Sequence, residues 1–349
     1  MTGTDGQTTV VAIALVAAAG LLSAVVTGLV LRLLRRRAIL DRPNERSSHT
    51  VPTPRGGGWG LLAGLLPSWI VLALLLAPGD PLALAPVAGV AVLAAVSWAD
   101  DRRGLPARVR FAVQTGVAAL ALLALPAGAA VTGGFLPLWL DRLLCLVAWV
   151  WFMNLYNFMD GIDGIAGGEA TAVGAGIAAV VAAMGLAPLW GWQGLAVAAA
   201  GAGFLLWNWH PAKLFMGDVG SVPLGYLLGW LLLNLAVSGA WAAALILPMV
   251  FVADATTTLL RRAWRGERVW QAHREHAYQR AVRRGLRHDQ VVILLSVANA
   301  GLVALALAST ADTATGFVTV AVAAALTLGM LRRLGGPADW TRGDGQPRP

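Results

Sequence analysis

The stretch NLYNFMDGIDGIAGG, residues 154–168, places two carboxylates and four glycines between two long apolar runs. Polar groups at this density suit the end of one apolar helix and the start of the next, because the bilayer interior offers them no hydrogen-bonding solvent. The whole chain is 58% apolar and only 13% charged, against roughly 25% charged residues in a soluble domain. The sequence therefore predicts an integral membrane protein.

Apolar segments of about 20 residues, the length that crosses a bilayer as a helix, recur along the chain. They predict an all-α polytopic membrane protein with about eleven transmembrane helices in a single domain, residues 1–333, followed by a polar, disordered tail, residues 334–349. The expected helices are residues 10–34, 58–77, 82–99, 109–128, 142–158, 165–186, 192–209, 220–237, 240–260, 290–309 and 315–333.

The distribution of positive charge predicts the orientation. Arg35, Arg36 and Arg37 follow the first apolar segment, and 25 of the 26 Lys and Arg residues, all but Arg142, fall in or beside loops on that same side. By the positive-inside rule this side is the cytoplasm, so we expect the N-terminus outside and the C-terminus inside. The net charge of +8 then faces anionic lipid and anionic solutes. The single cysteine, Cys145, excludes a disulfide framework.

The first loop on the basic side is LDRPNERSSHTVPTPRGGGWG, residues 40–60. In one interpretation, the N–H groups of Gly56, Gly57 and Gly58 bind an anion at the start of the next helix, with Arg55 beside them. In the other, the loop only holds positive charge at the membrane. A glycine run alone does not decide between the two.

Two adjacent acids, Asp100 and Asp101, stand at the inner end of the third expected helix. Acids at a helix C-terminus oppose the helix dipole and repel each other, so the pair stays ionised only if Arg102, Arg103 or a metal ion compensates. A salt-bridged helix end without chemistry is the alternative.

In the opening stretch, Asn157, Asp160 and Asp163 recur every three residues. If the helix continues through them, their side chains lie close together on one face. Carboxylate and amide oxygens are the hard ligands that Mg²⁺ takes, and the spacing differs from that of a calcium loop. A structural turn needs neither two acids nor an asparagine in register, so the pattern favours binding.

The loop NWHPAKLFMGDVGS, residues 208–221, contains Lys213 and Asp218. Gly217 and Gly220 indicate a tight turn that exposes the Asp218 carboxylate, and Ser221 is a candidate cap for the following helix. The same residues also suit a turn and a cap with no chemistry.

The longest loop on the basic side covers residues 261–289. A helix through it would align His273, His276, Arg280 and Arg284 along one stripe. Because no third soft ligand accompanies the two histidines, we favour an anion-binding face over a zinc site. An amphipathic helix lying on anionic lipid is the alternative.

All five polar segments lie on the same side of the predicted membrane, where they can converge. Carboxylates inside a ring of Arg, Lys and His are what a divalent metal and a phosphate-rich substrate require. A transporter of an anionic metabolite stays open as another class, but it should carry ionisable residues near the bilayer midplane. Here most acids lie at the ends of the expected helices, with Asp254 as the exception. A non-enzymatic lipid-binding scaffold has no use for the acids.

The chain resembles the polyprenyl-phosphate N-acetylhexosamine-1-phosphate transferases, glycosyltransferase family 4. The motifs that carry the resemblance, in order over residues 40–290, are PTPRGGG, the Asp100–Asp101 pair, NLYNFMDGIDG, PAKLFMGDVGS and AHREHAYQR. The third and fifth motifs are most similar to the bacterial branch that starts O-antigen or other surface polysaccharides. The phospho-N-acetylmuramoyl-pentapeptide transferase of peptidoglycan synthesis, which carries a different His-rich last loop, is the second choice.

The resemblance implies a cleft on the cytoplasmic face of the bacterial cytoplasmic membrane. It implies transfer of a sugar-1-phosphate from a UDP-N-acetylhexosamine to undecaprenyl phosphate or a similar polyprenyl phosphate, with release of UMP and with Mg²⁺ or Mn²⁺ as cofactor. The expected partners are these two substrates and membrane lipid, with a homodimer as the candidate assembly and no nucleic acid.

The resemblance also implies roles for matched residues. Asp218 would ligate the metal with Asn157, while Asp100 would deprotonate or orient the lipid phosphate, or Asp101 would share that role and help to hold the metal. Because the second pKa of a phosphate monoester lies near 6, we favour orientation and metal binding over proton abstraction for Asp100. Contacts with the nucleotide-sugar or its phosphates are expected from Asp160, Asp163, His273, His276, Arg280, Lys213 and Arg55.

Overall fold

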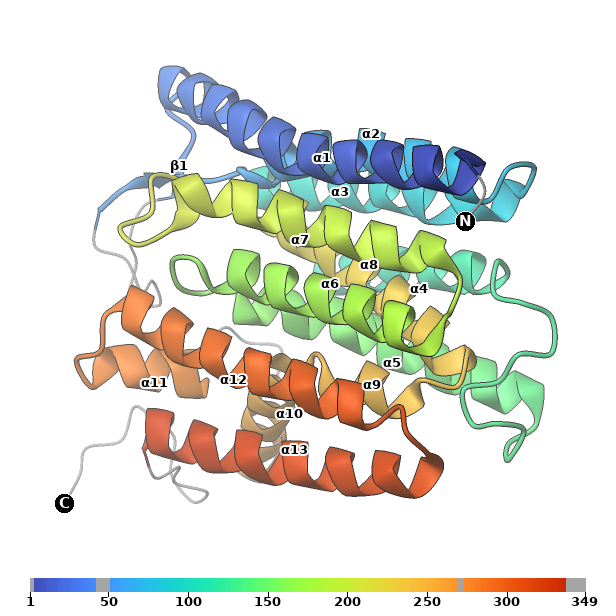
Figure 1. Cartoon of the computed structure of the whole chain (residues 1–349). Coiled ribbons are helices and arrows are strands. Elements are labelled where there is room, and N and C mark those ends of the chain that lie inside the picture. The colour runs from blue at the N-terminus through green and yellow to red at the C-terminus, as the bar shows by residue number, and fades with distance from the viewer. Residues whose placement is uncertain (1–2, 42–50, 269–272, 337–349) are drawn as a thin grey trace.

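The computed structural model describes residues 3–41, 51–268 and 273–336. In these residues the protein is a bundle of long helices that run roughly parallel or antiparallel (Figure 1), with one short antiparallel strand pair, β1 (Leu40–Asp41) and β2 (Thr53–Pro54). The all-α prediction is therefore confirmed. The predicted tail lies outside the described residues from 337 onward, and the last helix continues to Gly335.

The helices follow one another in the order that the apolar segments predict. Their bounds are α1 (Gly3–Arg36), α2 (Gly58–Leu76), α3 (Ala85–Arg103), α4 (Ala107–Leu122), α5 (Leu138–Met159), α6 (Ile165–Met184), α7 (Pro188–Asn208), α8 (Asp218–Val237), α9 (Trp241–Ile246), α10 (Met249–Trp264), α11 (Ala277–Arg283), α12 (His288–Ala308) and α13 (Thr313–Gly335), with a 3₁₀ turn, η1 (Pro81–Leu84), before α3.

Within the described part of the chain, nine helices are long and apolar enough to cross a membrane. The fourth expected span is shorter than predicted, because α4 ends at Leu122 rather than at residue 128. Its 16 residues rise only about 24 Å, less than the roughly 30 Å of a hydrocarbon core. Pro126 and Gly128, which follow, are residues that end a helix.

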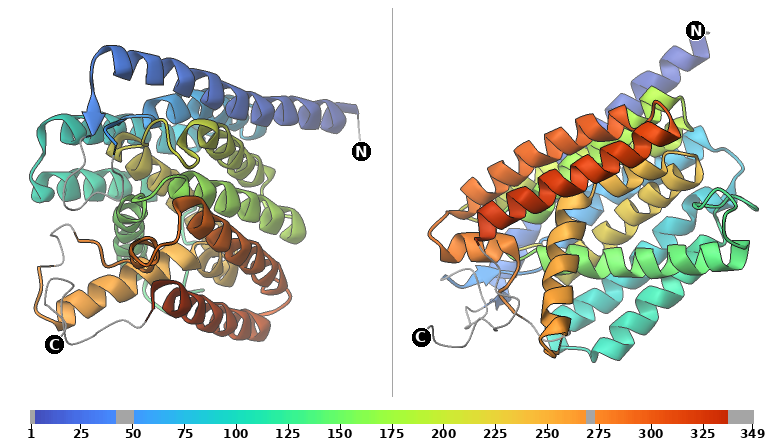
Figure 2. Two further views of the ribbon diagram at one scale, coloured as in Figure 1. Left: turned by 90° about the vertical axis from the view of Figure 1, so that its left-hand side faces the viewer. Right: turned by 90° about the horizontal axis from the view of Figure 1, so that it is seen from below.

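The prediction of one continuous helix over residues 240–260 is wrong. The segment is broken into α9 and α10 at Pro248. Proline has no N–H to donate and its ring clashes with the preceding turn, so the chain changes direction there. Figure 2 shows the result, since α10 crosses the other helices instead of running along them.

The helix α8 forms the centre of the bundle. Of its 20 residues, 17 are buried, and it packs most extensively against α3 and α5. A helix that is apolar on every face has no side to present to lipid or water, so its surroundings are protein. The first residue of α8, Asp218, is thereby held at the end of the most enclosed helix.

Close backbone packing fixes the start of α8 against the start of α2. A Cβ atom added to Gly58 would lie 2.3 Å from the Cα atom of Gly220. Side chains at these two positions would force the helix ends apart. The third glycine of the GGG run is therefore required for packing.

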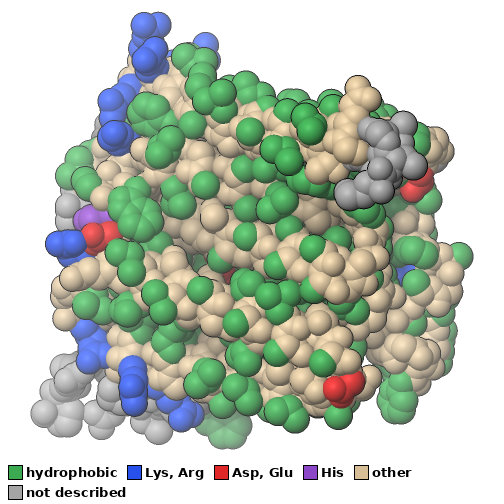
Figure 3. Space-filling model, viewed as in Figure 1, with side chains coloured by type: hydrophobic (Ala, Val, Ile, Leu, Met, Phe, Trp, Pro, Cys, Tyr) green, Lys and Arg blue, Asp and Glu red, His purple; other side chains and the backbone are tan. Residues whose placement is uncertain are grey.

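Basic residues gather at one end of the bundle. Figure 3 shows Lys and Arg concentrated at one edge of the molecule, and five of the described helices, α1, α3, α10, α11 and α13, carry two arginines each in their last turn. Arginine there also interacts favourably with the negative end of the helix dipole. The five polar segments singled out from the sequence meet at this end.

Packing at Gly58 provides a test of this arrangement. Gly58→Ala should destabilise the protein by about 2 kcal/mol or more, because an overpacked backbone contact has no flexible atom that can yield. Thermal unfolding in detergent measures the effect. Gly116→Ala in α4 is the matched control, since a Cβ at Gly116 meets nothing within 4 Å; equal stability of the two variants would contradict the packing argument.

Candidate active site

The carboxylate of Asp101 lies against the first turn of α8. Its two oxygens accept hydrogen bonds from the backbone N–H groups of Asp218 (3.3 Å) and Val219 (3.2 Å). The positive end of α8 thus offsets the charge that the C-terminus of α3 disfavours. Of the compensating groups considered from the sequence, Arg102 lies with its guanidinium over the Trp98 ring at 5.6 Å.

Arg55 joins the two acids of this cluster. One nitrogen, Nη2, lies 2.7 Å from Asp101 Oδ1 and 2.8 Å from Asp218 Oδ1. The two carboxylates come from helices far apart in sequence, and a single cation reaches both. The pKa of Arg55, which burial alone would lower, is raised above its usual value by Asp101 and Asp218, so it stays charged.

The glycine run beside Arg55 does not present free donors to an anion. The N–H groups of Gly56 and Gly57 donate to the carbonyl of Phe215 (3.2 and 2.9 Å), and that of Gly58 donates to the carbonyl of Met216 (2.9 Å). The anion-binding interpretation of these three N–H groups is therefore wrong. Their bonds instead position Arg55 next to Asp218.

Asp100 turns away from Asp101 toward α4. Its Oδ1 accepts from the N–H of Leu105 (2.6 Å) and its Oδ2 from Arg110 Nη1 (2.8 Å). The same Arg110 nitrogen lies 3.9 Å from Asp218 Oδ2. Arg110 was not singled out from the sequence. Nothing in the sequence distinguishes it from the other arginines that follow Asp101, such as Arg102 and Arg103.

A cavity of about 390 Å³ opens between α3, α4, α5 and α8. One part of its wall is polar, with Asp100, Arg110, Asn157 and Asp218. The rest is mainly apolar, formed by residues such as Leu93, Val96, Phe111, Val113 and Val222. The cavity therefore suits a molecule with a charged head and an apolar body.

Asn157 at the end of α5 lies beside Asp218. Its Nδ2 is 3.4 Å from Asp218 Oδ2, and its Oδ1 accepts a 2.6 Å hydrogen bond from Ser221 Oγ. The Ser221 hydroxyl also donates to the carbonyl of Gly217 at 3.3 Å, so Ser221 orients Asn157 and does not cap α8 through its N–H groups. Ser221 is a second residue whose part in the site the sequence did not indicate.

The helix does not continue through the DGIDG motif, so the prediction that Asn157, Asp160 and Asp163 share one helical face is wrong. The helix α5 ends at Met159 and α6 begins at Ile165. Asp160 stays near the carboxylate cluster. Burial raises its pKa to about 7, and Arg55, which lowers it, only partly offsets burial and the charges of Asp218 and Asp101.

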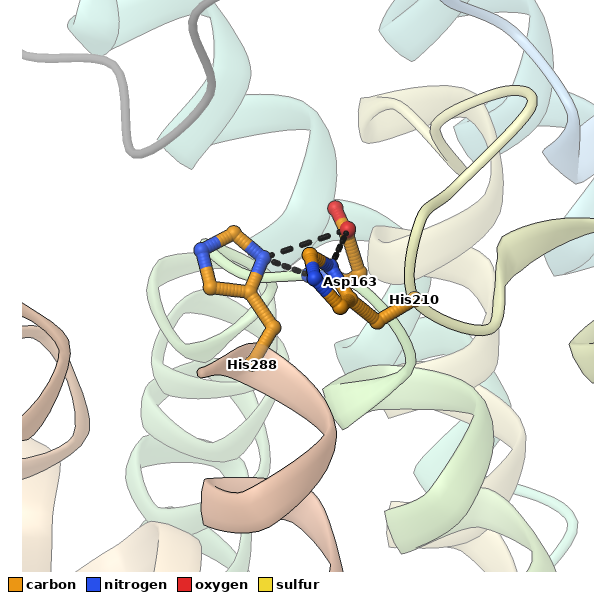
Figure 4. Close-up of side chains that lie close together, drawn as sticks. All are labelled: Asp163, His210 and His288. Atoms are coloured by element: carbon orange, nitrogen blue, oxygen red, sulfur yellow. Dashed lines mark hydrogen bonds and ion pairs between the residues drawn. The ribbon is translucent and has the colours of Figure 1, made fainter. Parts of the chain in front are cut away.

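Asp163 points to different partners. Its Oδ2 lies 2.6 Å from Nδ1 of His210 and 3.2 Å from Nδ1 of His288 (Figure 4). Burial alone would raise the pKa of Asp163, but hydrogen bonds with the two histidines and with the N–H of Ala212 lower it below the usual value. Neither histidine was singled out, although both are among only five in the chain.

The fifth loop is not one helix, so the predicted stripe of His273, His276, Arg280 and Arg284 does not form. The helix α10 ends at Trp264 and α11 begins at Ala277. The start of α11 is held by Asp254, whose carboxylate accepts from the N–H groups of Ala277 (2.8 Å) and Tyr278 (3.3 Å). Asp254, the exception among the acids, is thus explained as a cap.

The two histidines of this loop lie together, with ring centroids 4.8 Å apart. Burial, His276 and the nearby Arg262 and Arg261 lower the pKa of His273 to about 3, so its ring is neutral at physiological pH. The loop docks on the opening stretch through Tyr278, whose hydroxyl donates to the carbonyl of Phe158 (3.1 Å). Tyr278 therefore brings the fifth loop to the end of α5.

Two predicted residues lie away from the carboxylates. Lys213 is exposed, and its ammonium lies 5.3 Å from the Trp207 ring centroid. The guanidinium of Arg280 lies against Gly335 at the end of α13, where an added Cβ would be 2.6 Å from Nη2. The structure thus groups Arg55, Asp100, Asp101, Asn157, Asp160 and Asp218, and it places Asp163 with two other histidines.

The donor set at Asp218 fits a divalent cation. The oxygens of Asp101, Asp218 and Asn157 are hard ligands of the kind that Mg²⁺ prefers. The Arg55 nitrogen already lies between two carboxylates at 2.7 and 2.8 Å, which marks a point where positive charge is stabilised. To ligate the ion through Oδ1, the Asn157 amide would have to rotate by about 180° so that its oxygen faces Asp218. The Ser221 hydroxyl could then accept a hydrogen bond from Nδ2, because a hydroxyl can accept as well as donate.

Comparisons with known proteins bear on the family of the chain. The model of glycosyl transferase family 4 matches residues 83–236. A probable undecaprenyl-phosphate N-acetylglucosaminyl 1-phosphate transferase of Bacillus subtilis is 28% identical over 78% of this chain and 77% of that protein. A decaprenyl-phosphate N-acetylglucosaminephosphotransferase of Mycobacterium leprae is 31% identical over 83% of this chain and 82% of that protein.

The chain belongs to glycosyl transferase family 4. The family-level resemblance seen in the motifs is confirmed. This family-4 transferase is an integral membrane enzyme that transfers a sugar-1-phosphate to a polyprenyl phosphate from a nucleotide-sugar. A phospho-N-acetylmuramoyl-pentapeptide-transferase of Chlamydia pneumoniae is 34% identical, but over only 48% of this chain and 55% of that protein. Members of the family generally depend on a divalent metal.

Two substitutions at Asp101 should separate its contribution to fold stability from its electrostatic contribution to activity. Asp101→Ala removes both acceptors from the first turn of α8 and should destabilise the family-4 transferase by about 1–2 kcal/mol. Asp101→Asn keeps one acceptor but loses the ion pair with Arg55, so it should unfold near the wild-type temperature while losing most of its activity. Thermal unfolding and turnover measured on the same preparations check this; wild-type activity in Asp101→Asn would contradict it.

Proposed function

We propose that this transferase moves an N-acetylhexosamine-1-phosphate from a UDP-sugar to undecaprenyl phosphate or a similar polyprenyl phosphate, releasing UMP, with Mg²⁺ or Mn²⁺ as cofactor. The product starts a bacterial cell-surface polysaccharide such as O-antigen. The active site is the cluster of Asp100, Asp101, Asn157, Asp160 and Asp218, and it faces the cytoplasm.

One observation carries the proposal. Arg55 Nη2 contacts both Asp101 and Asp218, and Asp218 is also in the wall of the largely apolar cavity between α3, α4, α5 and α8. A cation-binding group of acids thus adjoins a space that suits a lipid. A transferase with one lipid phosphate and one water-soluble substrate needs this adjacency.

The lipid phosphate would enter from the cavity and bind near Arg110. Both oxygens of Asp100 are already engaged, by Leu105 and by Arg110. A carboxylate held in this way is suited to fixing the Arg110 side chain rather than to taking a proton. This supports orientation as the role of Asp100, since the phosphate monoester is mostly ionised at neutral pH.

Asp218 and Asn157, with help from Asp101, would hold the metal. When bound, the metal would supply positive charge that screens repulsion between the two phosphorylated substrates. Arg55 and Arg110 contribute positive charge on the same side. The protein's part is to align the attacking lipid phosphate oxygen in line with the departing UMP and to hold charge in place for that step.

The nucleotide-sugar would lie on the loop side of the cluster. Asp160 is the direct candidate for contact, whereas Asp163 is engaged by His210 and His288 and would act through them. His273 is neutral and would serve as a hydrogen-bonding group, with His276 behind it. Arg280 and Lys213 would have to leave Gly335 and Trp207 to reach a phosphate, which makes them the weakest members of the proposed set.

The cytoplasmic orientation rests on charge. Lys and Arg gather at one edge of the molecule (Figure 3), and two arginines, Arg55 and Arg110, contact the acids of the cluster. The positive-inside rule places that edge in the cytoplasm, where UDP-sugars are made available to the site.

A direct assay tests the proposal. Purified protein with undecaprenyl phosphate, Mg²⁺ and a panel of UDP-sugars should release UMP and form a lipid-linked sugar with at least one UDP-N-acetylhexosamine. Asp218→Asn should lower turnover by about a hundredfold or more, the loss typical of a group that stabilises transferring phosphate. Asp312→Asn is the control, because Asp312 caps α13 by accepting from the N–H and the hydroxyl of Thr315 (2.9 and 2.6 Å). Wild-type turnover in Asp218→Asn would overturn the site.

The role of Asp100 gives a pH-dependent outcome. If Asp100 orients Arg110, the activity lost in Asp100→Asn should not return at high pH, because the lipid phosphate is already ionised above its second pKa of about 6. If Asp100 is a base, hydroxide should replace it and the defect should shrink as pH rises. Turnover of wild type and Asp100→Asn measured across the same pH series decides between the two.

A further inference from the structure

A cluster of three side chains lies outside the carboxylate group and joins segments that are distant in sequence. Asp163 is in the turn between α5 and α6, His210 is in the loop between α7 and α8, and His288 is the first residue of α12. Figure 4 shows the two rings and the carboxylate turned toward one another. Nδ1 of His210 and Nδ1 of His288 both approach the same oxygen, Asp163 Oδ2, at 2.6 and 3.2 Å.

We propose that Asp163, His210 and His288 bind a transition metal of the zinc class at a site separate from Asp218 and Asn157. One ligand atom from each of the three residues lies within 4.8 Å of the others. Two imidazoles and one carboxylate form a ligand set that suits Zn²⁺, whereas Mg²⁺ prefers oxygen ligands and water.

The geometry needs only a small adjustment to hold the ion. Zn–N and Zn–O distances of about 2.1 Å in a tetrahedron separate the ligand atoms by roughly 3.3 Å. The His288 nitrogen is already 3.2 Å from the Asp163 oxygen. The His210 nitrogen, at 2.6 Å, has to move back by less than 1 Å. Because His210 is in a loop, its ring can make that movement.

The three side chains differ in solvent exposure, and this difference suits a metal site with one coordination position open to water. The side chains of Asp163 and His288 are 8% and 9% exposed, whereas that of His210 is 31% exposed. Solvent therefore reaches the cluster from the His210 side. Three protein ligands with a fourth position open to water is a common arrangement for zinc.

A metal here would tie three cytoplasmic segments together. The turn with Asp163 follows Asp160, the His210 loop leads to Asp218 through Ala212, whose N–H donates to Asp163 Oδ2 (3.1 Å), and His288 begins α12. Binding to the folded state alone stabilises that state. We therefore expect the site to stiffen the side of the fold that carries Asp160. This inference does not depend on which sugar or lipid is used.

Direct metal binding tests the proposal. Full-length protein purified in detergent without a polyhistidine tag is stripped with EDTA and titrated with Zn²⁺ in the presence of excess Mg²⁺, and metal content is measured by mass spectrometry. Co²⁺ is used in parallel because its visible absorption reports four-coordination by nitrogen and oxygen. The wild type should take up one Zn²⁺ per chain and its unfolding temperature should rise by several degrees.

Substitution of either histidine identifies the ligands. His210→Ala and His288→Ala should each weaken zinc binding by at least about tenfold, a loss seen even for outer-shell partners of a metal. His210→Asn and His288→Asn keep a polar group near the position of Nδ1. They control for the possibility that the alanine variants lose zinc only because they fail to fold. They should preserve thermal stability without metal but not restore zinc binding.

A second histidine pair serves as the matched control. His273→Ala removes a ring from the pair His273 and His276, and it should leave zinc binding unchanged. Absence of stoichiometric zinc in the wild type, or equal zinc binding in the His210 and His288 variants, would overturn the proposal and leave the cluster as hydrogen bonds only. Because the readout is metal uptake, failure here is independent of turnover in the Asp218→Asn assay.

Discussion

The contact between the Asp101 carboxylate and the first turn of α8 is the interaction on which the site depends. It brings the end of α3 to the start of the most buried helix of the bundle. Arg55 forms ion pairs with both Asp101 and Asp218. The glycine run allows α2 to pack on α8 without intervening side chains. Three segments that are far apart in sequence thus share one set of charges. Any displacement of α8 would disturb all of them.

The architecture could be predicted because lipid restricts the choices available to a chain. Apolar segments of bilayer length fixed the order of the helices, and the alternation of loops placed the polar motifs at one end. The departures have local causes. Pro248 broke a span that hydropathy alone presented as continuous, and α4 ended at Leu122, short of the predicted end. Hydropathy averaged over a window does not register a single proline.

The candidate site was predicted only in part, because partner choice depends on packing. Asp218, Asn157 and Arg55 do come together. The periodicity of Asn157, Asp160 and Asp163 suggested one helical face. Instead, α5 ends at the glycine-containing motif, and Asp163 contacts His210 and His288. Arg110 and these two histidines had no distinguishing pattern, and Ser221 was considered only as a helix cap. Their parts became visible only once helices distant in the chain were side by side.

The position of Arg55 has a consequence for the thermodynamics of cofactor uptake under the proposed function. Since a guanidinium already neutralises Asp101 and Asp218, a divalent ion would enter by exchange of cations rather than by addition to a bare acidic pocket. The free energy of metal binding would be reduced by the cost of displacing the arginine. The displaced charge stays covalently attached and close by, available to a phosphate that arrives with the metal. Metal and substrate would then bind more tightly together than either does alone.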